Sequence, residues 1–446
     1  MTKTSHPTEQ TSDTQEVSAG SASLAGSSRS APNGSVTAQK LPPVIILNLF
    51  YTGIAIARDL AGRGMRVVGL SAHREGPGNR TRLCEVLFSP NSHEQPEQLV
   101  EFLLQAATEL RGAVIFPTRD FDVLFLDRYR DVLGAHYRLA IPDRESLYRV
   151  VDKDALASVA RKADLPVPKT MVIRSADDLD QVPSQIGFPC VLKPVSSYQW
   201  REGGNWDAVG GRKAFLVESM EMLEKEYAMV RLAHHEVLVQ EWIPGGTENI
   251  VVIGGYVGAD SEPLAYFTAR KIVQSPDEFF GTGCIVRSED IPELLEPTQR
   301  LWKALDYRGM AEVEYKFDPR SKEFKLIEIN TRHWDQHELG RASGVNLSWT
   351  AYADLIGLDT NSKRVPTVQT TWIGEEALIQ HVLRGLYRRE IKLGKLRKQL
   401  KGPRIYGTFS WRDPLPFVHR CATVTVPTLG KQFLRNLFNG RNGRNL

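Results

Sequence analysis

The sequence contains few cysteines and no long apolar run. Its four cysteines lie far apart at Cys84, Cys190, Cys284 and Cys421, without a C-x-x-C pair and without a histidine cluster beside them. This usage argues against a disulfide framework and against a structural zinc site, and it fits a reducing compartment. No apolar stretch approaches the roughly 20 residues that a membrane-spanning helix needs. We therefore expect a cytoplasmic protein.

The first forty residues lack the apolar stretch of a signal peptide. They contain nine serines and six threonines but only three sizeable aliphatic residues. A segment of this composition buries too little apolar surface to fold, so we predict a disordered tail over residues 1–41. A transit peptide fits less well, because Glu9, Asp13 and Glu16 interrupt the segment.

The charge of the chain is nearly balanced overall but unevenly distributed. Lysine and arginine number 56 against 53 acidic residues, a net charge of +3. Residues 384–446 contain fifteen of these cations against only Glu390 and Asp413, so this segment carries +13 and the rest of the chain −10. We therefore treat residues 361–446 as a basic C-terminal extension.

Part of this extension has the pattern of an amphipathic helix. Residues 431–438 place Phe433, Leu434, Leu437 and Phe438 at helical spacing among cations. Such a helix can lie on an anionic membrane, which would make the protein peripheral at the inner face of the membrane. A packing helix with a solvated basic face is slightly favoured over this reading. No recognition motif accompanies the charge, so we expect no nucleic acid partner.

Residues 42–142 show the alternation of strands and helices that is typical of a parallel α/β domain. Residues 44–47 form a short apolar run, residues 54–63 have helical spacing, and residues 65–70 form a second apolar run. This order begins a parallel sheet with helices on its faces. The first turn contains only Gly53, whereas a dinucleotide fingerprint needs three glycines, so NAD binding is not expected.

The following segment is richer in strands. A helix near residues 146–162 opens it, and one further helix is expected at residues 219–233. Period-two and short apolar patterns predict the strands between and after these helices, at residues 187–193, 213–218, 237–241, 249–254, 265–271, 309–318 and 324–330.

The last two of these strands contain the most informative residues. In the stretch 311–317 apolar and charged residues alternate with a period of two, so Glu314 lies on a charged face. In the stretch 324–330, Glu328 and Asn330 share one face. The short polar loop between the two strands favours an antiparallel hairpin.

The register of that hairpin decides what its carboxylates can do. Pairing Phe324 with Asp318 places Glu328 directly opposite Glu314, and two carboxylates across a ladder repel each other. A divalent cation would remove this repulsion, and the amide oxygen of Asn330 is another hard ligand. Mg²⁺ completed by substrate phosphates is the natural occupant. The equally open alternative is that these are solvated glutamates on an exposed strand face.

A lysine and a glycine-rich loop follow another apolar strand. Lys193 ends the run at residues 188–194, and the loop after it contains Gly203, Gly204, Gly210 and Gly211. Glycines let backbone N–H groups approach phosphate oxygens, and the lysine supplies a positive charge. The spacing is not that of a P-loop, and an ordinary surface loop is the alternative.

Two further features suit a nucleotide and a transferring phosphoryl group. The strand that ends in Gln240 and Glu241 can offer polar groups to a purine edge, and Glu248 could hold ribose hydroxyls. Arg332 follows Asn330 closely, and Arg270 ends another strand; guanidinium groups near a metal site stabilise phosphoryl charge. A surface turn and solvated cations are the respective alternatives.

The order of these motifs resembles the ATP-grasp superfamily over about residues 42–358. Within it, the chain resembles carboxylate–amine ligases of the D-aspartate ligase type. The motifs are, in order, Lys153, Phe188-Pro189-x-Val191-x-Lys193-Pro194, the glycine-rich loop, Gln240-Glu241-x-Ile243-Pro244-Gly245, Glu314, Ile327-Glu328-Ile329-Asn330-x-Arg332 and, in the extension, Phe409-Ser410-x-x-Asp413-Pro414-x-Pro416.

The resemblance implies both the domain order and the roles of the residues. It implies a pre-ATP-grasp α/β domain at residues 42–142 and a two-lobed ATP-grasp domain at residues 143–360, whose small nucleotide lobe spans about residues 166–243. ATP would be bound through its phosphates by Lys153 and Lys193, through adenine by Gln240, Glu241 and Ile243, and through ribose by Glu248. Glu314, Glu328 and Asn330 would bind two Mg²⁺ ions, or Mn²⁺ in their place. Arg332, with Arg270, would steady the phosphoryl group and the acyl-phosphate.

The activity that the resemblance implies is the ATP-dependent joining of a small-molecule carboxylate to an amine. The carboxylate would attack the γ-phosphate of ATP to give an acyl-phosphate and ADP, and the amine would then displace phosphate to leave an amide. A carboxylating or acyl-phosphate-using transferase is the second reading. A nucleotide-binding regulator without turnover is the third, and the presence of both carboxylates and Arg332 disfavours it.

Overall fold

The computed structural model describes residues 41–195, 200, 209, 211–232, 236–275, 279–360, 369–389 and 391–427. Several segments discussed above lie outside these ranges: the predicted tail except for Leu41, the glycines of the loop except for Gly211, and residues 431–438.

The first domain is built on a five-stranded parallel sheet with the strand order β3-β2-β1-β4-β5. The predicted parallel α/β architecture is therefore confirmed. Its central strand β1 is buried along its whole length, because helices cover both faces of such a sheet. The strands are β1 (Val44–Ile46), β2 (Val67–Ser71), β3 (Glu85–Phe88), β4 (Val114–Phe116) and β5 (Arg138–Leu139), and the helices are α1 (Tyr51–Leu60), α2 (Pro96–Leu110), α3 (Asp120–Arg128) and α4 (Arg130–Gly134).

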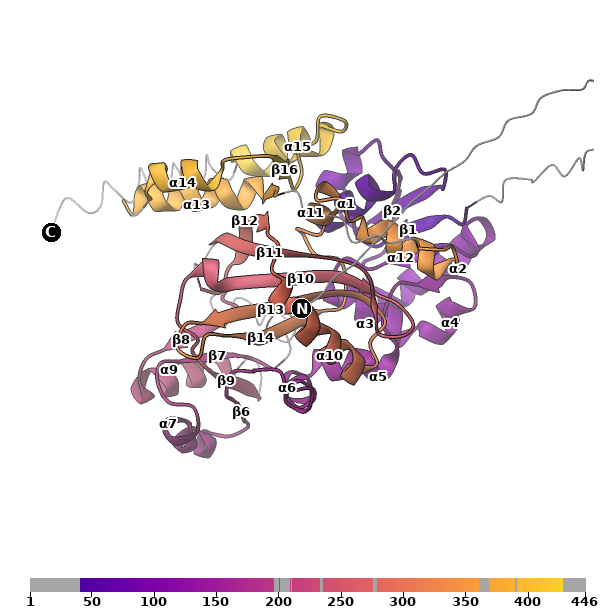
Figure 1. Cartoon of the computed structure of the whole chain (residues 1–446). Helices are drawn as coiled ribbons and strands as arrows, with labels where there is room; N and C mark the ends of the chain where they lie inside the picture. The colour runs from indigo at the N-terminus through magenta and orange to yellow at the C-terminus, as the bar shows by residue number, and fades with distance from the viewer. Residues whose placement is uncertain are drawn as a thin grey trace, which may run out of the picture. The chain divides into compact units, whose positions relative to one another are not determined.

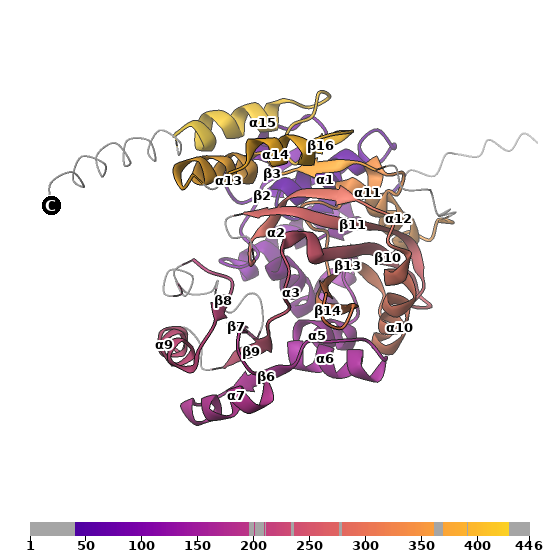
Figure 2. The same ribbon diagram turned by 60° about the vertical axis from the view of Figure 1, so that its left-hand side comes forward.

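Two helices lead into a small lobe that contains a four-stranded antiparallel sheet of order β6-β9-β7-β8. The carboxylate of Asp152 caps the second of these helices, accepting from the backbone N–H groups of Asp154 and Ala155, which fixes where Lys153 begins it. Figures 1 and 2 show this lobe at one end of the molecule. The elements are α5 (Arg144–Val151), α6 (Lys153–Lys162), β6 (Thr170–Ile173), α7 (Val182–Gln185), β7 (Cys190–Pro194), β8 (Phe215–Val217), α9 (Met220–Val230) and β9 (Val237–Glu241).

The largest element is a seven-stranded sheet of order β14-β13-β10-β11-β12-β15-β16. Val313 and Tyr315, on the apolar face of β13, pack with Leu301 and Trp302 of α10 in one buried cluster. The charged residues that alternate with them therefore point to the opposite face of the sheet. The elements are β10 (Ile250–Val257), β11 (Pro263–Ser275), β12 (Thr282–Ser288), α10 (Leu295–Leu305), β13 (Gly309–Asp318), β14 (Glu323–Asn330), β15 (Thr371–Ile373) and β16 (Arg404–Tyr406).

The hairpin of β13 and β14 has the predicted carboxylate pair but not the predicted turn. Glu314 does pair with Glu328, yet Asp318 pairs with Glu323, so the predicted pairing of Phe324 with Asp318 is wrong by one residue. An irregularity between Glu314 and Tyr315 absorbs the difference. An extra residue on one strand of a hairpin, a β-bulge, shifts the register in this way.

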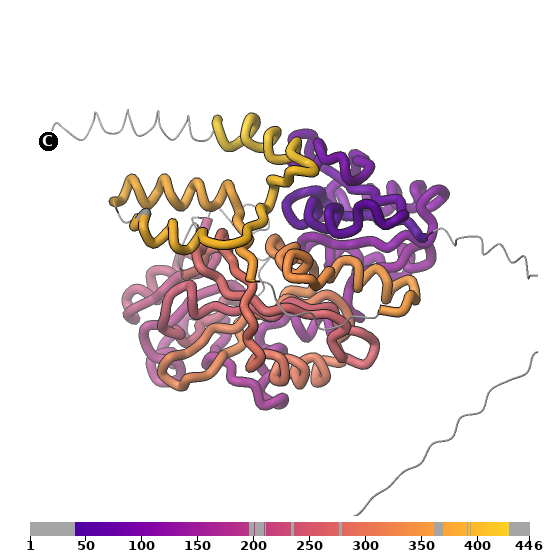
Figure 3. Tube along the Cα trace, turned by 45° about the horizontal axis from the view of Figure 1, so that its top comes forward, coloured from indigo at the N-terminus to yellow at the C-terminus, as the bar shows by residue number. Residues whose placement is uncertain are grey.

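The basic extension contributes two strands and three α-helices to the part of the chain that the structure describes. Strands β15 and β16 continue the large sheet beyond β12, and Figures 1 and 3 show α13 and α14 side by side next to them. The fully buried Asp413 accepts hydrogen bonds from Thr81 and from the backbone N–H of Arg82, which ties the extension to the first domain. The helices after β14 are α11 (Glu338–Ala342), α12 (Leu347–Leu355), α13 (Glu375–Tyr387), α14 (Leu393–Gln399) and α15 (Leu415–Arg420). Over the described residues, every helix is too short or too polar to cross a bilayer.

Candidate functional site

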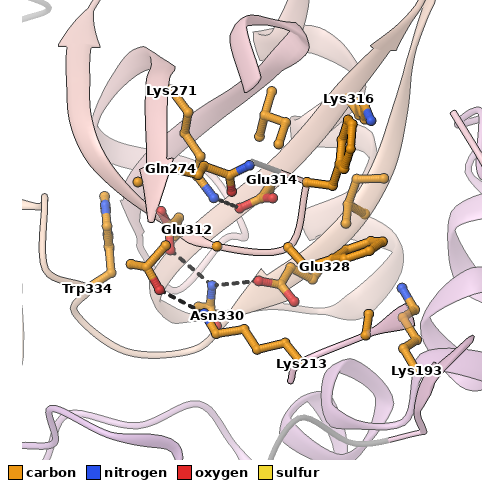
Figure 4. Close-up of a pocket in the computed structure, with 18 of the residues that line it drawn as sticks. Lys193, Lys213, Lys271, Gln274, Glu312, Glu314, Lys316, Glu328, Asn330 and Trp334 are labelled. Atoms are coloured by element: carbon orange, nitrogen blue, oxygen red, sulfur yellow. Dashed lines mark hydrogen bonds and ion pairs between the residues drawn. The ribbon is translucent and has the colours of Figure 1, made fainter. Parts of the chain in front are cut away.

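A cavity of about 550 Å³ lies on the charged face of β13 and β14. Figure 4 shows that lysines and glutamates from several strands point into it. The first domain also contributes to its wall, through Thr52 of α1 and residues 118–121, so all three sheet-containing parts of the chain line the cavity. Its charged lining residues are Arg119, Asp120, Lys153, Lys193, Lys213, Glu241, Lys271, Glu312, Glu314, Lys316, Glu328, Arg332 and Asp335.

Three glutamates form one wall of the cavity. Glu314 and Glu328 face each other across the hairpin, and Glu312 pairs with Asn330 one step further along. The amide nitrogen of Asn330 lies 2.9 Å from a carboxylate oxygen of Glu312 and 3.5 Å from one of Glu328. Glu312 is 5% exposed and Glu314 is 9% exposed. The alternative of a solvated glutamate on an open strand face is therefore wrong for Glu314, while Glu328 is half-buried.

Lysines surround these carboxylates. Lys271, on β11, forms an ion pair with Glu314. Burial lowers the pKa of Lys153 to about 7 and that of Lys193 to about 8. Burial by itself would raise the pKa of Glu328, but the charges of the neighbouring lysines, Lys153 foremost, outweigh it and lower that pKa. The wall therefore keeps Glu328 ionised.

Lys153 and Lys193 come from different elements but lie in the same cavity. The ammonium of Lys153 donates to the backbone oxygen of Pro194 at 2.8 Å, which holds the start of α6 against the end of β7. The ammonium of Lys193 donates to the side-chain oxygen of Gln240 at 2.8 Å. The structure thus brings three of the sequence-predicted nucleotide residues together.

The opposite end of the cavity is aromatic. The ammonium of Lys316 lies 4.2 Å from the centre of the Trp242 ring, and Phe279 meets that ring edge-on at 5.0 Å. The buried Ile243 lines the same region. Flat apolar surfaces with a few polar groups beside them suit a purine base.

Glu241 also lines the cavity, but its carboxylate already has partners. Arg320 donates to it at 2.6 Å, and the ammonium of Lys325 lies 3.2 Å from both of its oxygens. These contacts link the end of β9 in the small lobe to the β13–β14 hairpin. The side chain of Glu241 therefore joins the two sheets, whatever its backbone contacts.

Two of the sequence-predicted residues are not brought to the cavity. Glu248 is exposed and is absent from the cavity lining. Arg270 forms a two-pronged ion pair with Glu289, at 2.7 Å for both contacts, and donates to the backbone oxygen of Glu248 at 2.7 Å. Adjacent residues of a strand face opposite sides, so Lys271 reaches the cavity where Arg270 does not.

Arg332 does reach the cavity, and the first domain holds it there. Its guanidinium is bound by both carboxylate oxygens of Asp120, at 2.7 and 3.3 Å, at the start of α3. Burial acts to lower the pKa of Arg332, but Asp120 more than compensates and the pKa is raised. The guanidinium therefore remains a fixed positive charge.

The sequence reading missed Lys271, Lys213 and Glu312. Glu312 could have been found, because it lies two residues before Glu314 on the same face of an alternating strand. Lys271 could have been found only by knowing which face of β11 is turned inward. Lys213, whose ammonium donates to Thr282 at 2.7 Å, carries no local signal.

Comparison with known proteins connects this geometry to a family. The model of the carbamoyl-phosphate synthase L chain ATP-binding domain matches residues 282–353, which include Glu314, Glu328, Asn330 and Arg332. In sequence, the chain is 26% identical over 352 residues to D-aspartate ligase of Enterococcus faecium, covering 74% of this chain and 81% of that protein. It is 28% identical over 184 residues to D-alanine–D-alanine ligase of Ectopseudomonas mendocina, covering 41% and 55%.

Other matches cover less of the partner or share the fold alone. The chain is 23% identical to the carbamoyl phosphate synthase large chain of Methanoculleus marisnigri over 48% of this chain, but it spans only 20% of that protein. Among solved structures, N5-carboxyaminoimidazole ribonucleotide synthetase in complex with ADP superposes with a TM-score of 0.58 at 16% identity, covering 78% of this chain and 86% of that one. Biotin carboxylase of Campylobacter jejuni superposes with a TM-score of 0.56 at 18% identity, covering 73% and 72%. The chain therefore has the ATP-grasp fold and is similar in sequence to carboxylate–amine ligases of the D-aspartate ligase type.

Proposed function

We propose that the protein is an ATP-dependent ligase that joins a carboxylate to an amine through an acyl-phosphate. One observation carries this proposal: Glu314 and Glu328 face each other in the wall of a cavity that also receives Lys153, Lys193 and Arg332. Phosphoryl transfer depends on positioning and on charge stabilisation, and this cavity supplies cations and carboxylates for both. The similarity to D-aspartate ligase and D-alanine–D-alanine ligase supports the same chemistry.

The order of residues along β13 suggests how ATP would lie. Lys316 adjoins the aromatic end of the cavity, Glu314 lies in the middle among the lysines, and Glu312 lies at the end near Trp334. We place adenine beside Trp242 and the phosphates beside Lys193. The roles assigned to Glu248 and Arg270 remain predictions that need the ligand-bound protein.

The donor set on the hairpin fits Mg²⁺. Two carboxylates and an amide oxygen are hard ligands, and among the described residues no group of three or more His, Cys, Asp or Glu side chains is placed to hold a metal ion by itself. Mg²⁺ commonly uses one or two carboxylates and takes its other ligands from phosphates and water. Glu314, Glu328 and Asn330 would hold it, and it would offset charge on the phosphate oxygens. We also propose that the site holds two ions and that Mn²⁺ can replace Mg²⁺.

The reaction itself would proceed in two displacements. A carboxylate oxygen of the substrate attacks the γ-phosphorus, and the bond from that phosphorus to the bridging oxygen breaks to release ADP. The amine nitrogen then attacks the acyl carbon, the carbon–oxygen bond to phosphate breaks, and the nitrogen loses a proton to leave an amide. Arg332, fixed by Asp120, would stabilise charge on the phosphoryl group in both steps.

The similarity to D-aspartate ligase suggests that one substrate is an amino acid. The test measures ADP and phosphate release by the purified chain with candidate amines and carboxylates that include D-aspartate and D-alanine. Hydroxylamine is added in parallel, because it converts an acyl-phosphate into a stable hydroxamate. We expect ADP release that depends on the carboxylate and an amide product that contains the amine.

A carboxylating enzyme is the second candidate, and the superposition on biotin carboxylase and N5-carboxyaminoimidazole ribonucleotide synthetase favours it. ADP release that requires bicarbonate, without a hydroxamate from any other carboxylate, would replace the first proposal with this one.

We also propose that the protein acts in the cytoplasm.

A further inference from the structure

The basic extension presents exposed apolar side chains on α13 and exposed cations in the residues after it and on the neighbouring helix α14. Between residues 377 and 412 the sequence has ten lysines and arginines and a single acid, Glu390. We call the described part of this segment, α13, α14 and the turn up to Arg404, the basic apolar surface. Its exposed cations are Arg388, Arg389, Lys392, Lys395, Arg397, Lys398, Lys401 and Arg404.

Helix α13 has apolar residues on two opposite faces. Ala377 and Leu378 pack against the buried cluster of Val273, Cys284 and Ile285 on β11 and β12. Ile379, Leu383 and Leu386 follow an i, i+4, i+7 pattern that points away from this contact. Leu386 is 49% exposed, and Tyr387 beside it is 75% exposed. None of the thirteen residues of α13 is buried. Within the described part of the chain, the outward face therefore lacks the cover that the inward face has.

Helix α14 returns beside α13 through a tight turn. The backbone N–H of Ile391 donates to the oxygen of Gly385 at 3.2 Å, and a side chain at Gly385 would come within 2.9 Å of Ile391. Leu396 and Leu400 then pack on the same cluster as α13. An open groove beside α14 is lined by Leu396, Arg397, Leu400, Lys401, Gly402 and Arg404. Figures 1 and 3 show α13 and α14 side by side, and in the sequence the cations of this fold-back stand next to its leucines.

The described carboxylates that flank this surface are engaged elsewhere. Glu375 accepts from the backbone N–H of Phe409 at 2.7 Å, and Glu376 accepts from Tyr51 at 2.6 Å and from Arg420 at 2.8 Å. Asp413 is buried against the first domain. These contacts fix the basic apolar surface to the body of the protein. Because these carboxylates are engaged there, they do not neutralise the positive charge of the surface.

We propose that the basic apolar surface docks on an anionic lipid membrane. A membrane-surface helix combines cations, which bind anionic headgroups, with an apolar stripe that enters the boundary of the acyl chains. The basic apolar surface combines the two over a helix pair: α13 supplies the apolar stripe, and the residues after α13 together with α14 supply the exposed cations. A second copy of the chain is a poorer partner, because self-association through this face would bring two strongly basic surfaces together. The proposal concerns where the enzyme is held and does not depend on which reaction it catalyses.

The basic apolar surface lies close to the cavity, with the large sheet between them. On β11, Val273 packs under α13, whereas its neighbour Gln274 lines the cavity. On β12, Cys284 packs under α13 and Gly283 lines the cavity. The large sheet therefore separates the basic apolar surface from the cavity.

The test is co-sedimentation of the full chain with phosphatidylcholine vesicles, with and without phosphatidylglycerol. We expect binding only to the anionic vesicles, and weaker binding as salt is raised. The variant Arg388→Glu/Lys395→Glu should lose at least about 25-fold in partitioning, roughly fivefold for each cation removed. The variant Leu386→Ser/Tyr387→Ser should lose roughly tenfold.

Matched controls come from exposed residues elsewhere on the chain. Arg161→Glu/Lys162→Glu reverses two exposed cations at the end of α6, and Leu232→Ser removes a leucine that is 83% exposed. Both should bind vesicles like wild type, and ADP formation without vesicles should be unchanged in the α13 and α14 variants. Equal sedimentation of wild type and Arg388→Glu/Lys395→Glu overturns the proposal. So does a wild-type dimer that ignores vesicles and dissociates on Leu386→Ser/Tyr387→Ser.

Discussion

Burial raises the pKa of the carboxylates in the cavity, whereas the nearby lysines lower it. Burial dominates at Glu312 and raises its pKa to about 8, although Lys271 opposes it. At Glu328 the lysines dominate and the pKa is lowered. Glu312 on β13 and Glu328 on the paired strand β14 therefore have different charge states near neutral pH. The ionised one, Glu328, is the better ligand for a cation.

Replacing Glu328 with glutamine tests the metal assignment. Glu328→Gln keeps the shape of the side chain but removes the charge, so Mg²⁺-dependent ADP formation should fall by at least about 100-fold while the melting temperature stays close to that of wild type. Glu323→Gln, an exposed change at the start of the same strand, is the control and should be active. Wild-type turnover by Glu328→Gln would show that the metal is bound elsewhere.

Asp120 tests how the first domain positions Arg332. Asp120→Asn weakens the ion pair whose contacts are 2.7 and 3.3 Å, so the guanidinium should lose its fixed orientation. We expect kcat to fall roughly tenfold with little change in the KM for ATP, because misplacement affects the transferring group rather than adenine. Asp131→Asn, an exposed change in the same domain, serves as the control. A rise in KM alone would place Arg332 in ground-state binding.

At the scale of elements, the sequence predicts the alternation of side chains along a strand but not the irregularities of the strand. The predicted pairing of Glu314 with Glu328 is correct, because the bulge between Glu314 and Tyr315 compensates for the one-residue error at the turn. The bulge was not predictable, since it depends on how the loop after Asp318 closes. Likewise, the sequence could not decide between Arg270 and Lys271, because only the packing of β11 shows which face is inward.

Asp318 tests the cluster that closes this hairpin. The hydrogen bonds from Arg320, with help from Lys325, hold the pKa of Asp318 well below its usual range. Asp318→Asn should therefore lower the free energy of unfolding at pH 7 by about 2 kcal/mol. Because the folded-state pKa is lowered, this stabilisation is present above the unfolded pKa of about 4 and is lost as the pH falls below it.

The measurement is urea unfolding of wild type and Asp318→Asn at several pH values. The difference between them should be constant near neutral pH and should narrow only in acid. Asp180→Asn, at an exposed aspartate of the small lobe, should show no such pH dependence. A difference that persists unchanged into acid would mean that shape, and not charge, is what Asp318 supplies.

At the scale of the whole molecule, the sequence predicted the order of the parts but not how they are joined. Residues 371–373 and 404–406 complete the large sheet, although they lie in a segment that composition marks only as basic. Such short strands carry no periodic signal. The contacts between the first domain and the rest of the chain are also made by residues that are distant in sequence, which local patterns cannot reveal.

Asp59 is the centre of one such junction and provides the last test. It is 3% exposed on α1, and its carboxylate accepts from Arg341 at 2.7 Å and from Ser348 at 2.8 Å, with a ring nitrogen of His337 at 3.5 Å. Nearby on the same helix, Thr52 donates to Asp335 in the cavity lining at 2.8 Å. The helix thus supports the segment that follows Asn330.

Asp59→Ala removes the shared acceptor and leaves the partly exposed guanidinium of Arg341 and the buried hydroxyl of Ser348 without it. We expect the free energy of unfolding to fall by about 3 kcal/mol, and the first domain to unfold before the rest in urea. Glu109→Ala removes an exposed carboxylate of the same domain and should leave one wild-type transition. Because Asp59 lies outside the cavity lining, any loss of ADP formation at low urea must come through the segment that it supports. A single transition at the wild-type midpoint would show that the two parts are coupled mainly through their apolar contacts, which include the cluster shared by Ile56, Leu347 and Tyr352.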